Sequence, residues 1–107
     1  MSNKMMTLKE LHANHRNLAA GEVILDVRRP EEYASEHIEN AINISHETVA
    51  QHAEELKKHK TIYIHCKRGG RAKTAFETLA QAGLNNLVCI HDAGMDAWLE
   101  AGYPVVK

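Results

Sequence analysis

The sequence predicts an α/β protein built on an open parallel sheet of about four to five strands, with helices on both faces. Two observations support this fold class. Short apolar runs rich in β-branched residues alternate with stretches of helical periodicity along the whole chain. Neither an internal repeat nor a linker interrupts the 107 residues, so we expect a single domain over residues 1–107.

Each element has a local signal. Thr7 and Glu10 have the spacing of a capping box, and Pro30 suits the first position of a helix. Glycines follow several helical stretches, where they commonly end a helix. The elements expected in order are a helix from Thr7 to Gly21, a strand over 23–27, a helix from Pro30 to about His37, a strand over 41–44, a helix capped by Ser45 and running to about His59, a strand over 61–65, a helix over 71–82, a strand over 87–90 and a helix over 95–101.

Composition excludes several classes of protein. With 13 basic and 14 acidic side chains, the chain lacks the general basic character of a nucleic-acid-binding protein. No apolar run is long enough for a membrane span or a secretory signal, so we expect a cytoplasmic protein with no membrane partner. Two cysteines are too few for a disulfide framework.

The chemistry is expected at the carboxyl ends of the strands, where parallel α/β sheets bind ligands. Three segments fall there: 26–28, 65–71 and 91–94. In the second, Cys66 leaves a strand, Gly69 and Gly70 follow, and a helix begins. Paired glycines let several amide N–H groups converge on one point, and the helix N-terminus adds positive potential there.

Cationic side chains surround the same cysteine. Lys67, Arg68 and Arg71 lie within a few residues of its sulfur. Such surroundings favour the thiolate form of a cysteine and also suit a bound anion. The segment therefore predicts a thiolate nucleophile that faces an anionic substrate.

Three segments resemble the rhodanese family in sequence and in order. They are Leu25-Asp26-Val27-Arg28-Arg29-Pro30-Glu31-Glu32-Tyr33 with its continuation over 36–44, Ile62-Tyr63-Ile64-His65-Cys66 with the glycine loop, and residues 93–105 around Met95-Asp96-Ala97-Trp98. The chain departs from the family at Glu36 and Asn40, where a glycine is common, and at Ala93-Gly94, where the family has a glycine pair.

The resemblance implies a rhodanese-like sheet and a thiosulfate sulfurtransferase. Cys66 would take sulfane sulfur from thiosulfate or a similar donor as a persulfide and pass it to cyanide, a thiol or a protein acceptor. Lys67, Arg68, Gly69, Gly70 and Arg71 would bind the donor and stabilise the persulfide. No organic cofactor is implied, because the persulfide is built on the cysteine itself.

Asp26 and Arg28 are expected to support the site. A carboxylate at the end of a buried strand needs a charged partner, which Arg28 or a cation of the 65–71 loop could supply, so we favour an ion pair over a direct catalytic role. His65 should point away from Cys66, because side chains alternate along a strand. We expect Cys89 to be a buried, inert thiol and Trp98 to face the core. The eight histidines do not have zinc-site spacing with either cysteine, so no metal is expected.

Two alternatives remain open. Cysteine phosphatases and arsenate reductases resemble His-Cys-x5-Arg, whereas only four residues separate Cys66 from Arg71 here. The shorter loop suits sulfane sulfur better than a tetrahedral oxyanion. The domain could also be a non-catalytic sulfur carrier or a regulatory binding module.

Overall fold

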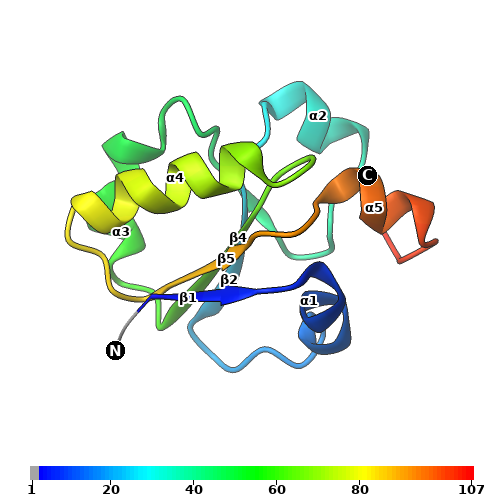
Figure 1. Ribbon diagram of the computed structural model, residues 1–107, viewed down its shortest axis with the longest axis horizontal. Helices are drawn as coiled ribbons and strands as arrows, with labels where there is room; N and C mark the ends of the chain where they lie inside the picture. Colours follow the sequence, from blue (N-terminus) through cyan, green and yellow to red (C-terminus); the bar gives the residue numbers. More distant parts are fainter. Residues whose placement is uncertain (1–2) are drawn as a thin grey trace.

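The structure is a computed structural model that describes residues 3–107. Five parallel strands form one sheet in the order β1-β5-β4-β2-β3, with helices on both faces (Figure 1). The predicted fold class is therefore confirmed. The elements are β1 (Lys4–Met6), α1 (Leu8–Asn14), β2 (Glu22–Asp26), α2 (Pro30–Ser35), β3 (Ile42–Asn43), the 3-10 helix η1 (Val49–His52), α3 (Ala53–Leu56), β4 (Thr61–His65), α4 (Gly70–Gln81), β5 (Leu87–Ile90) and α5 (Met95–Glu100).

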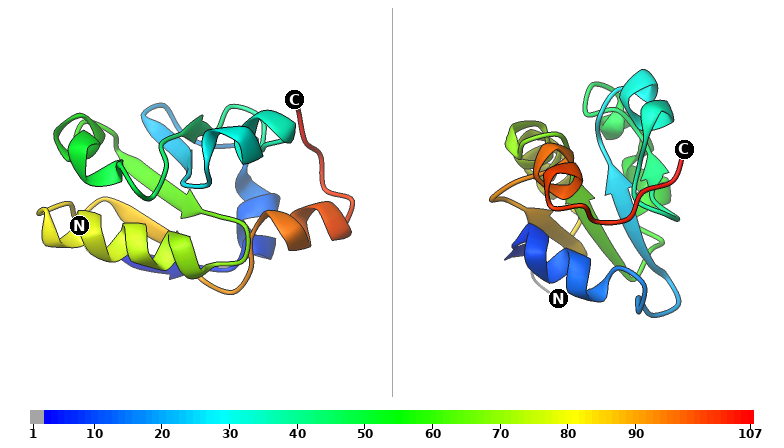
Figure 2. Two further views of the ribbon diagram at one scale, coloured as in Figure 1. Left: turned by 90° about the horizontal axis from the view of Figure 1, so that it is seen from above. Right: turned by 90° about the vertical axis from the view of Figure 1, so that its right-hand side faces the viewer.

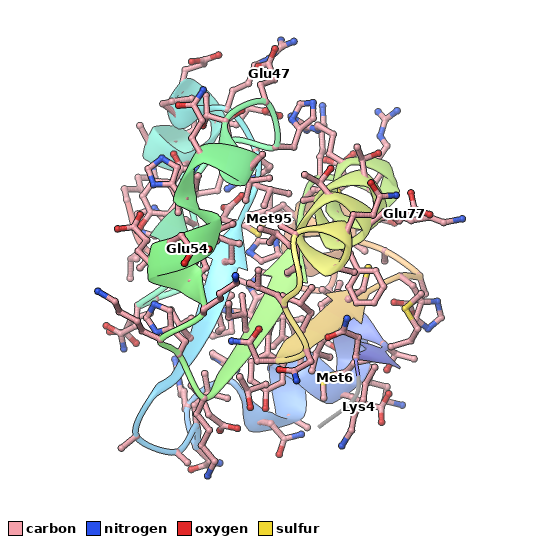
Figure 3. The ribbon with its side chains drawn as sticks, turned by 90° about the vertical axis from the view of Figure 1, so that its left-hand side faces the viewer. Lys4, Met6, Glu47, Glu54, Glu77 and Met95 are labelled. Atoms are coloured by element: carbon pink, nitrogen blue, oxygen red, sulfur yellow. The ribbon has the colours of Figure 1, made fainter. Side chains whose placement is uncertain are left out.

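The hydrophobic core lies in two layers, one on each face of the sheet. Alternate side chains of the central strands point to opposite faces. Leu25, Ile64 and Cys89 pack against η1, α3 and α4, whereas Ile24 and Ile90 pack against α1 and α5. Figure 3 shows Met95 in the interior, and Glu47 and Glu77 at the periphery. Helix α4 covers one face of the sheet and α5 covers the other. The loop after β4 therefore lies at the edge of the sheet, between these two helices.

The first helix begins as predicted and ends earlier than predicted. The amide of Glu10 donates to Thr7 Oγ1 at 3.1 Å, and the Thr7 amide donates to Glu10 Oε1 at 3.0 Å, which completes the capping box. The helix ends at Asn14 rather than at Gly21. Asn14 Nδ2 donates to the Glu10 carbonyl, so a polar side chain competes locally with the helical backbone pattern.

The prediction of one helix from Ser45 to about His59 is wrong. The chain continues beside β2 as far as His46, whose amide donates to the Val27 carbonyl at 2.9 Å. Ser45 Oγ then accepts from the Glu47 amide and forms a turn instead of a helix cap. Only the short helices η1 and α3 follow, because the hydrogen bond to β2 and the turn at Ser45 involve the residues that were predicted to form the first helical turn.

The N-terminal strand β1 was not predicted. Its three residues pair in parallel with β5 in the register Lys4↔Val88, Met5↔Cys89 and Met6↔Ile90. A lysine followed by two methionines has no alternation and little β propensity, so its pairing depends on a distant strand. Within residues 3–107, no helix has the length and apolar character needed to cross a lipid bilayer.

Two departures from the rhodanese pattern are compatible with the backbone. Asn40 has a φ of 69°, a left-handed conformation that asparagine tolerates better than most residues. Glu36 has a φ of −168°, which is extended backbone open to any residue. Neither position 36 nor position 40 therefore requires the glycine that is common in the family.

Candidate active site

The carboxyl ends of β2 and β4 meet at one edge of the sheet. Asp26 and His65 are direct partners in the parallel register, and Cys66 follows at once. Helices α2 and α5 lie at this end of the sheet, while α4 begins there (Figures 1 and 2). The parallel topology therefore brings the predicted segments 26–28 and 65–71 together.

The Cys66 sulfur lies inside its own loop. The residue is 1% exposed, and its Sγ accepts a hydrogen bond from the Gly69 amide at 3.0 Å. Gly69 has a φ of 115°, a conformation that favours glycine, and a Cβ on it would lie 3.2 Å from the His91 carbonyl oxygen. The loop is thus built to turn an amide toward the sulfur.

The Gly69 amide is the one backbone donor to this sulfur among residues 3–107, and other amides of the loop are left without an acceptor. Within residues 3–107, the amides of Lys67 and Arg68 have no hydrogen-bond acceptor. The first amides of α4, which begins at Gly70, have no acceptor within their own helix. These groups and the α4 dipole supply positive potential beside Cys66.

The two loop arginines are already paired with carboxylates. Arg71 makes two hydrogen bonds to Glu32 of α2, with nitrogen–oxygen distances of 2.6 and 3.1 Å. These hydrogen bonds lower the pKa of Glu32 from 4.5 to about 2, so the carboxylate stays ionised. Arg68 lies 3.0 Å from Asp96 of α5 in an exposed pair.

Lys67 differs from both arginines. Among the described residues it has no carboxylate partner within ion-pair distance. Its side chain lines a cavity of about 300 Å³ between α2 and α5. The cavity is also lined by Arg28, Leu99 and three carboxylates, those of Glu32, Glu36 and Asp96. Cations, acids and an apolar group therefore meet there.

The expected ion pair between Asp26 and Arg28 is present and buried. Arg28 Nη2 lies 2.8 Å from Asp26 Oδ2, with side-chain exposures of 4% and 0%. Arg28 Nε also donates to Asp26, and Nη2 donates to the Glu36 carbonyl at 2.7 Å. The pair therefore ties the end of β2 to the segment after α2, beside the Cys66 loop.

His65 and Cys89 are both buried next to this site. His65 Nε2 lies 3.9 Å from Asp26 Oδ2 and has no hydrogen-bond partner within residues 3–107. Burial lowers the pKa of His65, which favours the neutral ring. Burial raises the pKa of the Cys89 thiol to about 11, so this cysteine stays protonated.

The structure adds residues that the sequence did not reveal. Glu32 and Asp96 hold the loop arginines, although they lie 39 and 28 positions away along the chain. Gly94 and the amides of Met95 and Asp96 contact the Cys66 loop directly. The Glu32 capping contact to Arg29 was recognisable from local spacing, but its contact with Arg71 was not.

This fold and this loop define a class of protein. The family model described as "Rhodanese-like domain" matches residues 7–101. The chain belongs to the rhodanese-like family.

Individual relatives agree with that assignment. A rhodanese-related protein from Thermoplasma volcanium superimposes with a TM-score of 0.81 at 33% identity, covering 96% of this chain and 97% of that one. The putative sulfur carrier protein YrkF of Bacillus subtilis is 36% identical over 75 residues, covering 70% of this chain and 40% of its own length. The thiosulfate sulfurtransferase GlpE of Coxiella burnetii is 28% identical over 76 residues, covering 71% of this chain and 70% of its own. The chain spans about half the length of the curated relatives it matches first.

Proposed function

We propose that the protein is a sulfurtransferase that carries sulfane sulfur as a persulfide on Cys66. The observation that carries the proposal is the Cys66 sulfur at the end of β4, held by the Gly69 amide and facing the start of α4. A thiolate in such surroundings is stabilised without any metal or second nucleophile. The resemblance to GlpE supports thiosulfate as a donor.

The reaction would have two displacements. The Cys66 thiolate attacks the sulfane sulfur of thiosulfate, the sulfur–sulfur bond breaks, and sulfite leaves with the bonding electron pair. Cyanide or a thiolate then attacks the outer sulfur of the persulfide, and the Cys66 thiolate leaves. The amides of Lys67, Arg68 and Gly69 would stabilise the persulfide anion between the two steps.

Donor binding would depend on the loop cations and amides. Arg71 shares its charge with Glu32, and Arg68 shares its charge with Asp96. Lys67 lines the cavity between α2 and α5 and, among residues 3–107, has no carboxylate within ion-pair distance. We therefore propose Lys67 as the main cationic contact for an anionic donor, with Arg68, Gly69, Gly70 and Arg71 completing the site.

A sulfur carrier is the second candidate. The sulfur is buried and both loop arginines are paired, which suits slow exchange with small anions in bulk solvent. YrkF, a relative of this chain, is named a putative sulfur carrier. A carrier would load its persulfide readily and release it slowly to cyanide.

Steady-state transfer from thiosulfate to cyanide tests the enzymatic proposal. We expect multiple turnovers in the wild-type protein, none in Cys66→Ser, and an unchanged rate in Cys89→Ala. Loading without turnover would favour the carrier. Hydrolysis of an aryl phosphate that depends on Cys66, without sulfur transfer, would favour the phosphatase alternative.

A further inference from the structure

The N-terminus of α5 holds the Cys66 loop from one side. The Met95 amide donates to the Cys66 carbonyl at 2.8 Å, and the Asp96 amide donates to the Lys67 carbonyl at 3.1 Å. Amides in the first turn of a helix have no partner within the helix. Here two of them bond consecutive carbonyls of the loop that carries the nucleophile.

This contact fixes the direction of the loop amides. In a trans peptide unit the carbonyl and the N–H point in opposite directions. The carbonyls of Cys66 and Lys67 point toward α5, so the N–H groups of Lys67 and Arg68 point away from it. The Cys66 side chain packs in the core layer under α4, whereas Met95 of α5 packs in the opposite layer. The two free amides therefore point away from α5, toward the layer in which the sulfur packs, while only the Gly69 amide donates to the sulfur among residues 3–107.

Only glycine at position 94 allows α5 to come this close. A Cβ built on Gly94 would lie 2.1 Å from the Cys66 carbonyl oxygen and 2.5 Å from the Lys67 carbonyl carbon. The Gly94 φ of −156° is extended backbone that any residue adopts. The requirement for glycine therefore comes from the close approach alone.

We propose that Gly94 is a positioning residue for the Cys66 centre. Its missing side chain lets the Met95 and Asp96 amides hold two carbonyls, which directs the Lys67 and Arg68 amides toward the sulfur and stabilises its anionic form. The effect on the thiolate is independent of the reaction, while the effect on the persulfide rests on the proposed function.

Gly94→Ala tests this role through the reactivity of the thiol. We expect the rate of Cys66 alkylation by iodoacetamide at neutral pH to fall roughly ten-fold, about the size of one hydrogen bond to a charged group. Trp98→Phe is the control, because Trp98 is a fully buried residue of the same helix whose indole bonds Pro104. Trp98→Phe should lower the unfolding midpoint and leave the alkylation rate unchanged.

A wild-type measurement keeps the proposal testable if Gly94→Ala does not fold. In the ¹⁵N-labelled protein, the Lys67 and Arg68 amide resonances should shift with pH in step with the alkylation rate, because both amides face the sulfur. Lys67 and Arg68 resonances that do not shift when the thiol ionises would contradict the proposal.

The variant also has a contradicting outcome. A folded Gly94→Ala protein that is alkylated at the wild-type rate would refute the positioning role. Slow alkylation of this variant, in a protein whose wild type accepts no sulfur from any donor, would support Gly94 and refute the sulfurtransferase. The two proposals therefore fail separately.

Discussion

At the scale of single residues, the site depends on charges that are paired away from water. The clearest case is the ion pair between Asp26 and Arg28, with side-chain exposures of 0% and 4%. Replacing Arg28 with methionine keeps most of the apolar stem and leaves the Asp26 carboxylate without its partner. We expect a loss of about 3–5 kcal/mol in the free energy of unfolding, measured in urea.

Arg68→Met is the matched control for this loss. Arg68 pairs with Asp96 through a single Nε contact at 3.0 Å, and its side chain is 78% exposed. Breaking an exposed pair should cost less than about 1 kcal/mol. Equal losses in the two variants would contradict the structural role given to the buried pair.

Glu32 gives the site a predicted dependence on acid. The folded state holds its pKa at about 2, below the ordinary 4.5. The ion pair with Arg71 therefore stabilises the folded state fully at pH values above the ordinary pKa of 4.5. This stabilisation is lost as the pH falls toward 2. Glu32→Gln should be less stable than wild type by about 1–2 kcal/mol near neutral pH, since the pair is a quarter exposed.

Urea midpoints measured from about pH 6 down to pH 3 test this dependence. The difference between wild type and Glu32→Gln should shrink as the solution becomes acidic. Glu54→Gln is the control, because Glu54 pairs with Lys57 on the surface with 87% exposure. A constant difference across this range would contradict the role of the Glu32 charge.

Cys89 is expected to be unreactive in the folded protein. Burial raises its thiol pKa to about 11. Cys66 is also buried, at 1% exposure, but its sulfur accepts a hydrogen bond from the Gly69 amide, so the two thiols differ in their electrostatic surroundings. In the native protein, iodoacetamide should modify Cys66 and leave Cys89 unmodified, whereas both should react after unfolding in urea. Modification of Cys89 in the folded protein as fast as that of Cys66, detected by peptide mass, would contradict its raised pKa.

The sequence indicated the residues of the proposed site more readily than it indicated their partners. Cys66, the glycine pair and the cations are adjacent, so local spacing revealed them. Glu32 reaches Arg71 only because α2 and the loop meet at one end of the sheet. Nothing in the local pattern indicates that contact.

At the scale of elements, the strongest predictions came from elements that form by local rules. The strand β4 and the helix α4 have the expected bounds to within one residue, because each has a clear period and a clear end. The segment 45–59 has helix-forming residues, but a turn closed by the Thr48 amide on the Ser45 carbonyl precedes the short helices. β1 was missed because its pairing with β5 joins opposite ends of the chain.

The capping box of α1 yields a prediction at this scale. Thr7→Ala removes the hydroxyl that accepts from the Glu10 amide, and it should cost about 1 kcal/mol of stability. Thr74→Ala is the control, because its exposed hydroxyl only donates to a carbonyl within α4. Equal effects of the two variants on the urea midpoint would contradict the cap.

At the scale of the whole molecule, the sheet and the helices on its two faces position the loop that carries Cys66. The parallel topology places β2, β4 and β5 so that their carboxyl ends share an edge. Helix α4 covers one face and begins beside Cys66, while α5 covers the other and bonds the loop from behind. The fold therefore places the Gly69 amide at the sulfur on one side and the α5 amides on the carbonyls of Cys66 and Lys67 on the other.

The intact mass of the protein after incubation with thiosulfate tests the central claim most directly. We predict a gain of one sulfur atom in the wild-type protein, its removal by cyanide, and no gain in Cys66→Ser. A wild-type protein that gains no sulfur from thiosulfate or from a small persulfide, or a gain that persists in Cys66→Ser, would contradict a persulfide on Cys66.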